Sequence, residues 1–166
     1  MTAKCFLDGG IVDQLSAGIA LSDRGFTLGD GVFETFRVRD GAVVDIPAHL
    51  ERLTAALDTL AFPRPGLDRG LAYHLEETRE ANGIAEGVLR LTVTRGKGAR
   101  GLAPSPEAVP TVCITVAGLP SRPDSFTAVI AARTRRNEFS PLSRIKSLSY
   151  LDNVIALGEA NGRGAD

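Results

Sequence analysis

Lysine is scarce in this chain of 166 residues. Only Lys4, Lys97 and Lys146 occur, and the other sixteen basic residues are arginines. An arginine keeps its proton at any useful pH, whereas a lysine can lose it, and only a neutral amine forms an imine with a carbonyl group. Lys4 lies at the N-terminus and Lys97 lies in a glycine-rich loop. Lys146, between an apolar run and the start of a predicted helix, is therefore the best candidate for lysine-imine chemistry.

Cysteine and histidine are also rare, with two residues of each. Cys5 and Cys113 fall in strand-like apolar segments, where buried free thiols are favoured over a disulfide, and a reducing cytoplasm fits that pattern. His49 and His74 lie on separate predicted helices without the spacing of metal ligands. We therefore expect no metal site.

The chain has neither an excess of charge nor a long apolar run. A net charge of -1 gives no reason to expect nucleic acid or an anionic membrane as the main partner. No apolar run approaches the roughly 20 residues needed to span a bilayer, and no signal-peptide pattern opens the chain. Hydrophobic residues at 43% and charged residues at 23% are typical of a soluble globular protein. A cytoplasmic protein is expected.

Predicted helices and strands alternate irregularly, which favours an α+β fold. A hairpin is predicted at residues 4–13, with Gly9-Gly10 as its turn. The other predicted strands of the first part are Val32–Arg39, Ala42–Ile46, Val88–Arg95 and Thr111–Ala117. A helix is predicted to start at Pro47 and to bury Leu50, Leu53, Leu57 and Leu60. A second helix is predicted to run from Asp68, a possible N-cap, to Asn82-Gly83.

A boundary between two domains is predicted near residue 119. Residues 1–118 would form a small N-terminal α/β domain, and residues 119–125, which contain two prolines, would form an interdomain linker. Residues 126–166 would begin a larger mixed C-terminal domain, with a strand at Phe126–Arg133 and a helix of about residues 150–161 capped by Ser149. One strand cannot make a sheet or enclose a core. Either this domain is incomplete, which we favour, or it docks onto another surface.

Four motifs follow one another along the chain. They are Asp23-Arg24-Gly25-Phe26 with Gly29-Asp30-Gly31-Val32-Phe33-Glu34; His49-Leu50-Glu51-Arg52-Leu53; Thr94-Arg95-Gly96 through Arg100-Gly101; and Ile145-Lys146-Ser147-Leu148. Any one of them is weak evidence, but all four in this order are specific. The chain resembles the class-IV aminotransferase family, the fold-type-four pyridoxal-phosphate enzymes. The resemblance covers essentially the whole chain and implies a D-amino-acid aminotransferase-like fold that is truncated, because the chain matches only the first part of a full-length member.

The resemblance implies roles for three basic residues. Lys146 would attach pyridoxal 5′-phosphate and, once freed, would move the substrate's α-proton as general base and acid. Arg52 would hold the cofactor phosphate, which a planar guanidinium matches well. Arg100, on a glycine-rich flexible loop, would bind a substrate carboxylate across the interface of a homodimer. Without the resemblance, Lys146 would be interpreted as an ordinary exposed lysine and Arg52 as a helix arginine paired with Glu51 or Asp58. Arg100 would be a solvent-exposed charge on a mobile surface loop.

Two aromatic residues, Phe33 and Tyr150, are the other candidates for substrate binding. The D-amino-acid enzyme has a tyrosine in place of Phe33 and a histidine in place of Leu102, which argues against carboxylate recognition of the D-alanine type. Tyr150 matches an aromatic residue near the lysine of branched-chain enzymes if a gap of one residue is allowed, and a packing role is equally open. Glu34 lies on a predicted core face, so it needs a partner if it is buried, and its role stays open.

The expected function is that of a pyridoxal-phosphate enzyme acting on a small amino substrate. We favour aminodeoxychorismate lyase, which releases pyruvate and 4-aminobenzoate, because Arg136-Asn137 and the Arg-Gly after the glycine-rich loop resemble that enzyme. An aminotransferase for branched-chain, D- or other amino acids with a 2-oxo acid acceptor is the alternative. A truncated, non-catalytic binding or dimerisation module is the alternative of another class. The family's glutamate for the pyridine nitrogen is expected beyond Asp166, and a chain without it is expected to be inactive.

Overall fold

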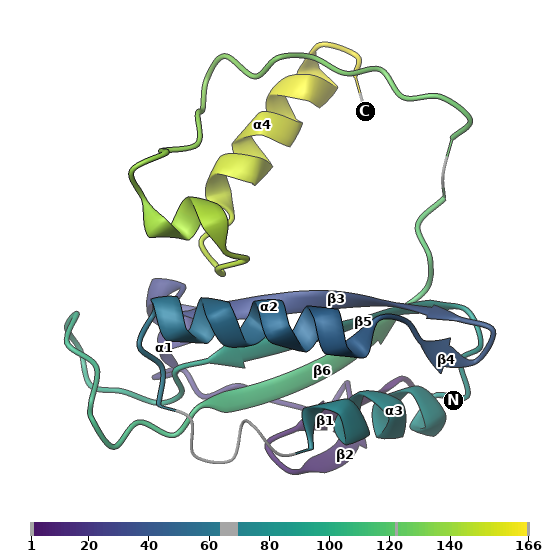
Figure 1. Cartoon of the computed structure of the whole chain (residues 1–166), viewed down its shortest axis with the longest axis vertical. Coiled ribbons are helices and arrows are strands. Elements are labelled where there is room, and N and C mark those ends of the chain that lie inside the picture. Colours follow the sequence, from purple (N-terminus) through teal and green to yellow (C-terminus); the bar gives the residue numbers. More distant parts are fainter. Residues whose placement is uncertain (1, 64–69, 122, 166) are drawn as a thin grey trace.

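The protein is built on an antiparallel sheet. The structure, a computed structural model, describes residues 2–63, 70–121 and 123–165. Within these residues the sheet has six strands in the order β2-β1-β6-β5-β3-β4 (Figure 1). Their bounds are Lys4–Leu7 for β1, Gly10–Asp13 for β2, Gly31–Arg39 for β3, Ala42–Val43 for β4, Gly87–Thr94 for β5 and Thr111–Ala117 for β6. The predicted mixed α+β class is confirmed.

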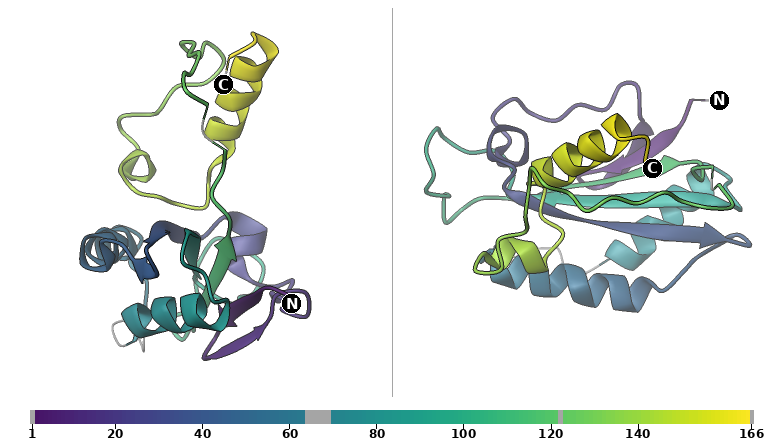
Figure 2. Two further views of the ribbon diagram at one scale, coloured as in Figure 1. Left: turned by 90° about the vertical axis from the view of Figure 1, so that its right-hand side faces the viewer. Right: turned by 90° about the horizontal axis from the view of Figure 1, so that it is seen from above.

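Helices α2 (Ile46–Thr59) and α3 (Leu71–Ala81) cover the same face of the sheet, as the side view in Figure 2 shows. The part of the chain that the structure describes also forms the short α1 (Arg24–Leu28), the 3-10 helix η1 (Pro141–Arg144) and α4 (Leu151–Gly162). Figure 1 shows α4 standing away from the helix-covered face, beyond the β3 edge of the sheet. No helix of the described residues is long and apolar enough to cross a membrane.

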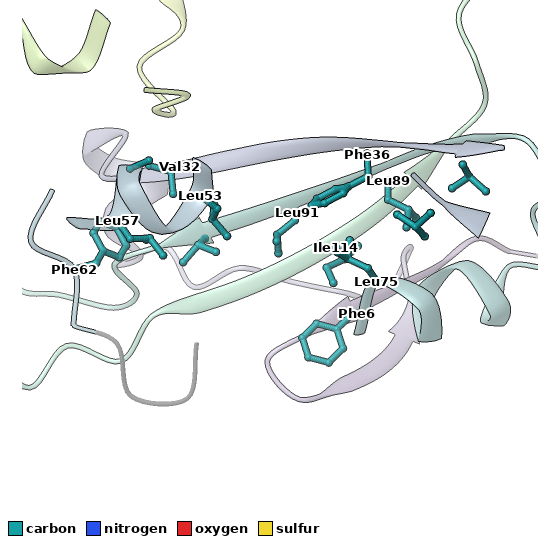
Figure 3. Close-up of a cluster of buried hydrophobic side chains, with 14 residues drawn as sticks. Phe6, Val32, Phe36, Leu53, Leu57, Phe62, Leu75, Leu89, Leu91 and Ile114 are labelled. Atoms are coloured by element: carbon teal, nitrogen blue, oxygen red, sulfur yellow. The ribbon is translucent and has the colours of Figure 1, made fainter. Parts of the chain in front are cut away.

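The core lies between the sheet and α2 and α3 (Figure 3). Alternation along β3 directs Val32, Phe36 and Val38 inward, where each is fully buried. The predicted apolar face of α2 packs on them, with Leu53 and Leu57 buried and the two other leucines partly buried. Full burial of one such side chain stabilises a fold by about 1.5–3 kcal/mol. This packing holds β3, the strand that carries most of the site, against α2.

Several boundaries differ from those predicted. Strand β4 is shorter than expected, because Asp45 adopts the left-handed region at φ 54° and α2 begins at the next residue. A further helix, α1, forms in the turn-rich stretch, with Asp23 as its N-cap and Gly29 at φ 67° as its C-cap. The predicted cap Asp68 lies outside the described residues. The predicted stop of α3 is confirmed by Asn82 at the C-cap.

The predicted strand Phe126–Arg133 is wrong, because that segment is irregular in the structure. The backbone amides of Ala132 and Arg133 donate to the carboxylate of Glu159 on α4, at 3.0 Å, and not to a neighbouring strand. A strand requires such a neighbour to satisfy its backbone. Ser149 is not the cap of α4 either: the N-cap is Tyr150, and no side chain makes a capping bond. The two-domain division itself stays a prediction, and residue 122 of the proposed linker lies outside the described residues.

Candidate active site around Lys146

Backbone hydrogen bonds to β3 hold the segment that carries Lys146. The amide of Phe33 donates to the carbonyl of Lys146 at 2.9 Å, and the amide of Leu148 donates to the carbonyl of Gly31 at 2.9 Å. Val32 and Ser147 form the antiparallel bridge between these two bonds. Directly opposed residues share one face of a sheet, so Lys146 and Phe33 project together from the face opposite Val32. The lysine is thus placed by its main chain.

Glycine at position 31 permits this close approach. A Cβ on Gly31 would lie 2.6 Å from Cδ1 of Leu148 and 2.6 Å from the carbonyl oxygen of Val93. Gly29, at φ 67°, would similarly bring a Cβ to 3.1 Å from Oγ of Ser149. The two glycines of the Gly-Asp-Gly motif therefore let the lysine segment lie directly on the start of β3.

The ring of Phe33 is the centre of a cluster of four side chains. Lys146 Nζ lies 4.7 Å from the ring centroid, and Cζ of Arg90 lies over the ring at 3.8 Å. The ring of Tyr150 meets Phe33 edge-on, with centroids 5.1 Å apart. Phe33 is only 5% exposed. Three residues predicted for the site, Lys146, Phe33 and Tyr150, are thus brought together, and cations over a ring face attract it electrostatically.

Arg90 was missed by the sequence reasoning. It lies on β5 opposite Thr35, on the same face as Phe33. Within the described residues no carboxylate pairs with it, and Nε donates to Oγ1 of Thr92 at 3.3 Å. Partial burial lowers the pKa of the Arg90 guanidinium, an effect that the Tyr150 hydroxyl opposes. One signal was available: Arg90 is the single charged residue of the otherwise apolar and threonine-containing strand β5.

Arg52 lies on the other side of β3, on α2. Its Nε donates to Oε1 of Glu34 at 2.7 Å and its Nη2 to Oε2 at 2.5 Å, while Nδ1 of His49 lies 2.9 Å from Oε2. Burial alone would raise the pKa of Glu34, but hydrogen bonds and charge from Arg52 and His49 outweigh it and hold that pKa below its ordinary value. The structure thus gives Glu34 the partner that its burial required. The predicted phosphate role of Arg52 stays a prediction.

The loop that carries Arg100 is attached to α1 by Arg24. The buried Arg24 guanidinium donates from Nη1 to the carbonyl of Gly101 at 3.1 Å and from Nη2 to the carbonyl of Leu102 at 2.8 Å. Gly98 packs on the same side chain, since a Cβ there would lie 2.9 Å from Cδ of Arg24. Arg100 is exposed, and no hydrogen bond, ion pair or ring contact of the described residues joins it to the Phe33 cluster.

Asp30 links this loop to the end of α2. One oxygen, Oδ2, accepts from Nε of Arg24 at 2.8 Å and from Nε of Arg95 at 2.8 Å. Arg95 also donates to the carbonyls of Leu60 and Ala61, at 2.7 and 3.0 Å. Arg24 and Arg95 are buried and Asp30 is partly buried, and their mutual bonds join α1, the start of β3 and the loop that follows β5. Among the described residues no cluster of three or more His, Cys, Asp or Glu side chains could hold a metal ion.

A match to a family model decides the family. Residues 31–166 match the model of the amino-transferase class IV family. The chain belongs to the class-IV aminotransferases. This family uses pyridoxal phosphate, so the predicted family, fold and cofactor are confirmed at the level of the family.

Class-IV aminotransferases of several activities resemble the chain. A Methanocaldococcus jannaschii protein, provisionally named a branched-chain-amino-acid aminotransferase, is 34% identical over 165 residues, 98% of this chain and 57% of the relative. The crystal structure of 4-amino-4-deoxychorismate lyase from Pseudomonas aeruginosa is 32% identical with a TM-score of 0.76, covering 93% of this chain and 56% of that one. A hypothetical aminotransferase from Mycobacterium tuberculosis, in a PLP-bound form, is 30% identical with a TM-score of 0.81, covering 98% and 60%. The chain spans little more than half the length of these relatives.

Proposed function

We propose that this chain supplies the reactive lysine and three anion-binding arginines of a pyridoxal-phosphate enzyme that acts on a small amino substrate. The observation that carries the proposal is the cluster around Phe33. It places the Lys146 amine 4.7 Å from the centroid of a buried ring that also carries the guanidinium of Arg90 at 3.8 Å. Arg90, which pairs with no carboxylate of the described residues, lies at the same ring as a held amine, and this arrangement suits a substrate that carries an anionic group.

The bonding of Arg52 leaves a donor for the cofactor phosphate. Arg52 uses Nε and Nη2 on Glu34, so among the described residues Nη1 has no hydrogen-bond partner and can donate to a phosphate. When bound, pyridoxal phosphate supplies an aldehyde that bonds to the lysine amine and a ring that accepts electrons from a bond broken at the substrate's α-carbon. Arg52 would hold the phosphate and Lys146 the aldehyde carbon.

The protein's own side chains would then divide the work on the substrate. Arg90 would bind the substrate carboxylate and so orient the α-carbon toward Lys146. The amine of Lys146, once released, would remove the substrate's α-proton as a general base and then donate a proton as a general acid. Phe33 and Tyr150 would exclude water from one side of the amine. A homodimer in the cytoplasm completes the proposal, with Arg100 of a second copy as a further carboxylate ligand.

Within this class we propose aminodeoxychorismate lyase activity first. It is supported by the 32% identity to the Pseudomonas aeruginosa lyase and by Phe33 and Leu102, which place no polar side chain where the D-amino-acid enzyme has two. Aminotransfer is the second candidate, supported by the 34% identity to the Methanocaldococcus jannaschii protein. Formation of 4-aminobenzoate and pyruvate, or of a 2-oxo acid from an amino acid, separates the two activities in one product assay.

Borohydride trapping tests the proposal. The protein is incubated with pyridoxal phosphate, reduced, digested and mapped by mass spectrometry. We expect a yellow chromophore before reduction and a stable adduct on Lys146, and we expect Lys97→Arg to label as fully as wild type. A colourless protein, or an adduct confined to Lys97, would overturn the proposal in favour of a non-catalytic binding module.

A further inference from the structure

Glu34 is a buried carboxylate whose oxygens are both occupied. It is 1% exposed and lies on the core-facing side of β3 between Val32 and Phe36. A buried charge is unfavourable unless it is paired and hydrogen-bonded. Glu34 accepts a two-pronged bond from Arg52 and a further contact from His49 Nδ1. A carboxylate of this kind fixes the direction of the groups that bind it.

The arrangement holds only one edge of the Arg52 guanidinium. Nε and Nη2 face Glu34, so the planar group is fixed and Nη1 projects from the opposite side. The Arg52 side chain is 54% exposed although one edge of its guanidinium is bonded to Glu34, so a ligand can reach it from solvent. His49, one turn earlier on the same face of α2, is itself held against the ring of Phe36 with centroids 4.7 Å apart.

We infer that Glu34 is a positioning residue that orients Arg52 for the cofactor phosphate, an inference that rests on the function proposed above. A fixed guanidinium loses less rotamer freedom when it binds a phosphate than one that moves freely in solvent. The negative charge of Glu34 acts in the opposite direction, because it offsets part of the attraction between Arg52 and an anion. Positioning prevails here because the Glu34 charge is shared between Arg52 and His49, whereas the orientation of Arg52 depends on Glu34.

The test compares pyridoxal phosphate with pyridoxal, which has the same aldehyde but no phosphate. Dissociation constants for both are measured from the imine absorbance of the protein and from the extent of borohydride trapping on Lys146. Replacing Glu34→Gln keeps the size of the side chain but removes its charge, and Glu34→Asp keeps the charge but shortens the reach. We expect both to lower the preference for pyridoxal phosphate over pyridoxal about tenfold, and we expect the same of Arg52→Gln. In the double variant Glu34→Gln/Arg52→Gln, the preference for pyridoxal phosphate over pyridoxal should be no lower than in Arg52→Gln alone.

Glu86→Gln is the matched control. Glu86 also pairs with an arginine, Arg37, but on the exposed side of the sheet, and its loss should leave the preference unchanged. If Glu34→Asp keeps the wild-type preference while Glu34→Gln changes it, charge alone matters and the inference is wrong. An equal weakening of both aldehydes, which indicates a purely structural role, overturns it as well, and so does a stronger preference in Glu34→Gln.

Inorganic phosphate separates this inference from the proposed function. Its binding is followed by the NMR shift of the Arg52 Nε–H, which needs no lysine chemistry. A shift in wild type that is lost in Glu34→Gln and Glu34→Asp supports the positioning role even if Lys146 takes up neither aldehyde, a result that would overturn only the proposed function. No shift at Arg52 in wild type would overturn the positioning role.

Discussion

Replacing Gly31 with alanine should separate the Lys146 segment from β3. The added methyl group would lie 2.6 Å from the carbonyl oxygen of Val93 and 2.6 Å from Cδ1 of Leu148. The Leu148 side chain can rotate away, but the Val93 carbonyl belongs to β5 and cannot move without opening the sheet. The less costly response is for the first residues of β3 to shift relative to the Lys146 segment, which breaks the two hydrogen bonds that place the lysine.

The expected destabilisation follows from that overlap. Overpacking a well-packed site costs typically 1–3 kcal/mol, and contact with a backbone oxygen puts this variant in the upper part of that range. For a protein of this size, each kcal/mol lowers Tm by roughly 2–4 °C. We therefore expect Tm to fall by about 4–12 °C in a thermal melt, together with lost hydrogen-exchange protection at the amides of Phe33 and Leu148.

A second glycine supplies the control. Nothing lies within 4 Å of a Cβ at Gly18, whose φ is not positive, so Gly18→Ala should be neutral or stabilise by up to about 1 kcal/mol. A Tm of Gly31→Ala equal to those of Gly18→Ala and wild type would refute the prediction. It is also refuted if Tm falls while the amides of Phe33 and Leu148 keep their protection, because the damage would then lie elsewhere in the sheet.

Three further predictions concern polar groups. Arg24→Gln should accelerate tryptic cleavage after Arg100 about tenfold or more, because it removes the bonds that hold the Arg100 loop and each bond from a charged donor is worth roughly 1.5–3 kcal/mol. The exposed control Arg37→Gln should be cleaved after Arg100 at the wild-type rate. Equal rates in wild type and both variants would contradict the expectation. The pKa of Glu34 is held below its ordinary value of 4.5, so its stabilising contribution is complete above pH 4.5 and is lost as the pH falls through the lower, folded value. The Tm of wild type should thus fall more steeply than that of Glu34→Gln below pH 4.5, and parallel curves would show that the ionised carboxylate adds no stability. Burial, with the negative charges nearby, raises the pKa of the Cys113 thiol to about 11. Iodoacetamide at pH 8 should therefore modify this thiol slowly in the folded protein and rapidly after unfolding. Fast labelling of Cys113 in the folded protein would contradict the prediction.

Most of the regular structure was predictable because its signals are local. Alternation of apolar residues located β3, and the leucine spacing located α2, since the core-facing side of each element repeats with the period of its own backbone. The Phe126–Arg133 segment shows the limit of that reasoning. Its residues favour a strand, but its amides bond to Glu159 instead, and no local pattern states which partner a backbone will find.

The candidate site was predicted unevenly for the same reason. Lys146 was predicted from its rarity and its motif, and the structure places both its amine and the ring of Tyr150 at the ring of Phe33. Arg90 was missed because it has no motif of its own and becomes notable only when β5 pairs with β3. The partner of Arg52 was also missed, because Glu34 lies eighteen positions away along the chain.

The sequence by itself determined the family, the choice of Lys146 as candidate and many of the core residues. Motifs and apolar periodicity, on which these depend, are properties of neighbouring residues. Only the tertiary structure decided which groups meet: Lys146 and Arg90 at the ring of Phe33, and Glu34 at the guanidinium of Arg52. These contacts join separate strands and helices, and their geometry depends on strand register and helix packing. The sequence therefore singles out Lys146 as the candidate for the proposed chemistry, and the pairing of its segment with β3 places its amine beside the ring of Phe33.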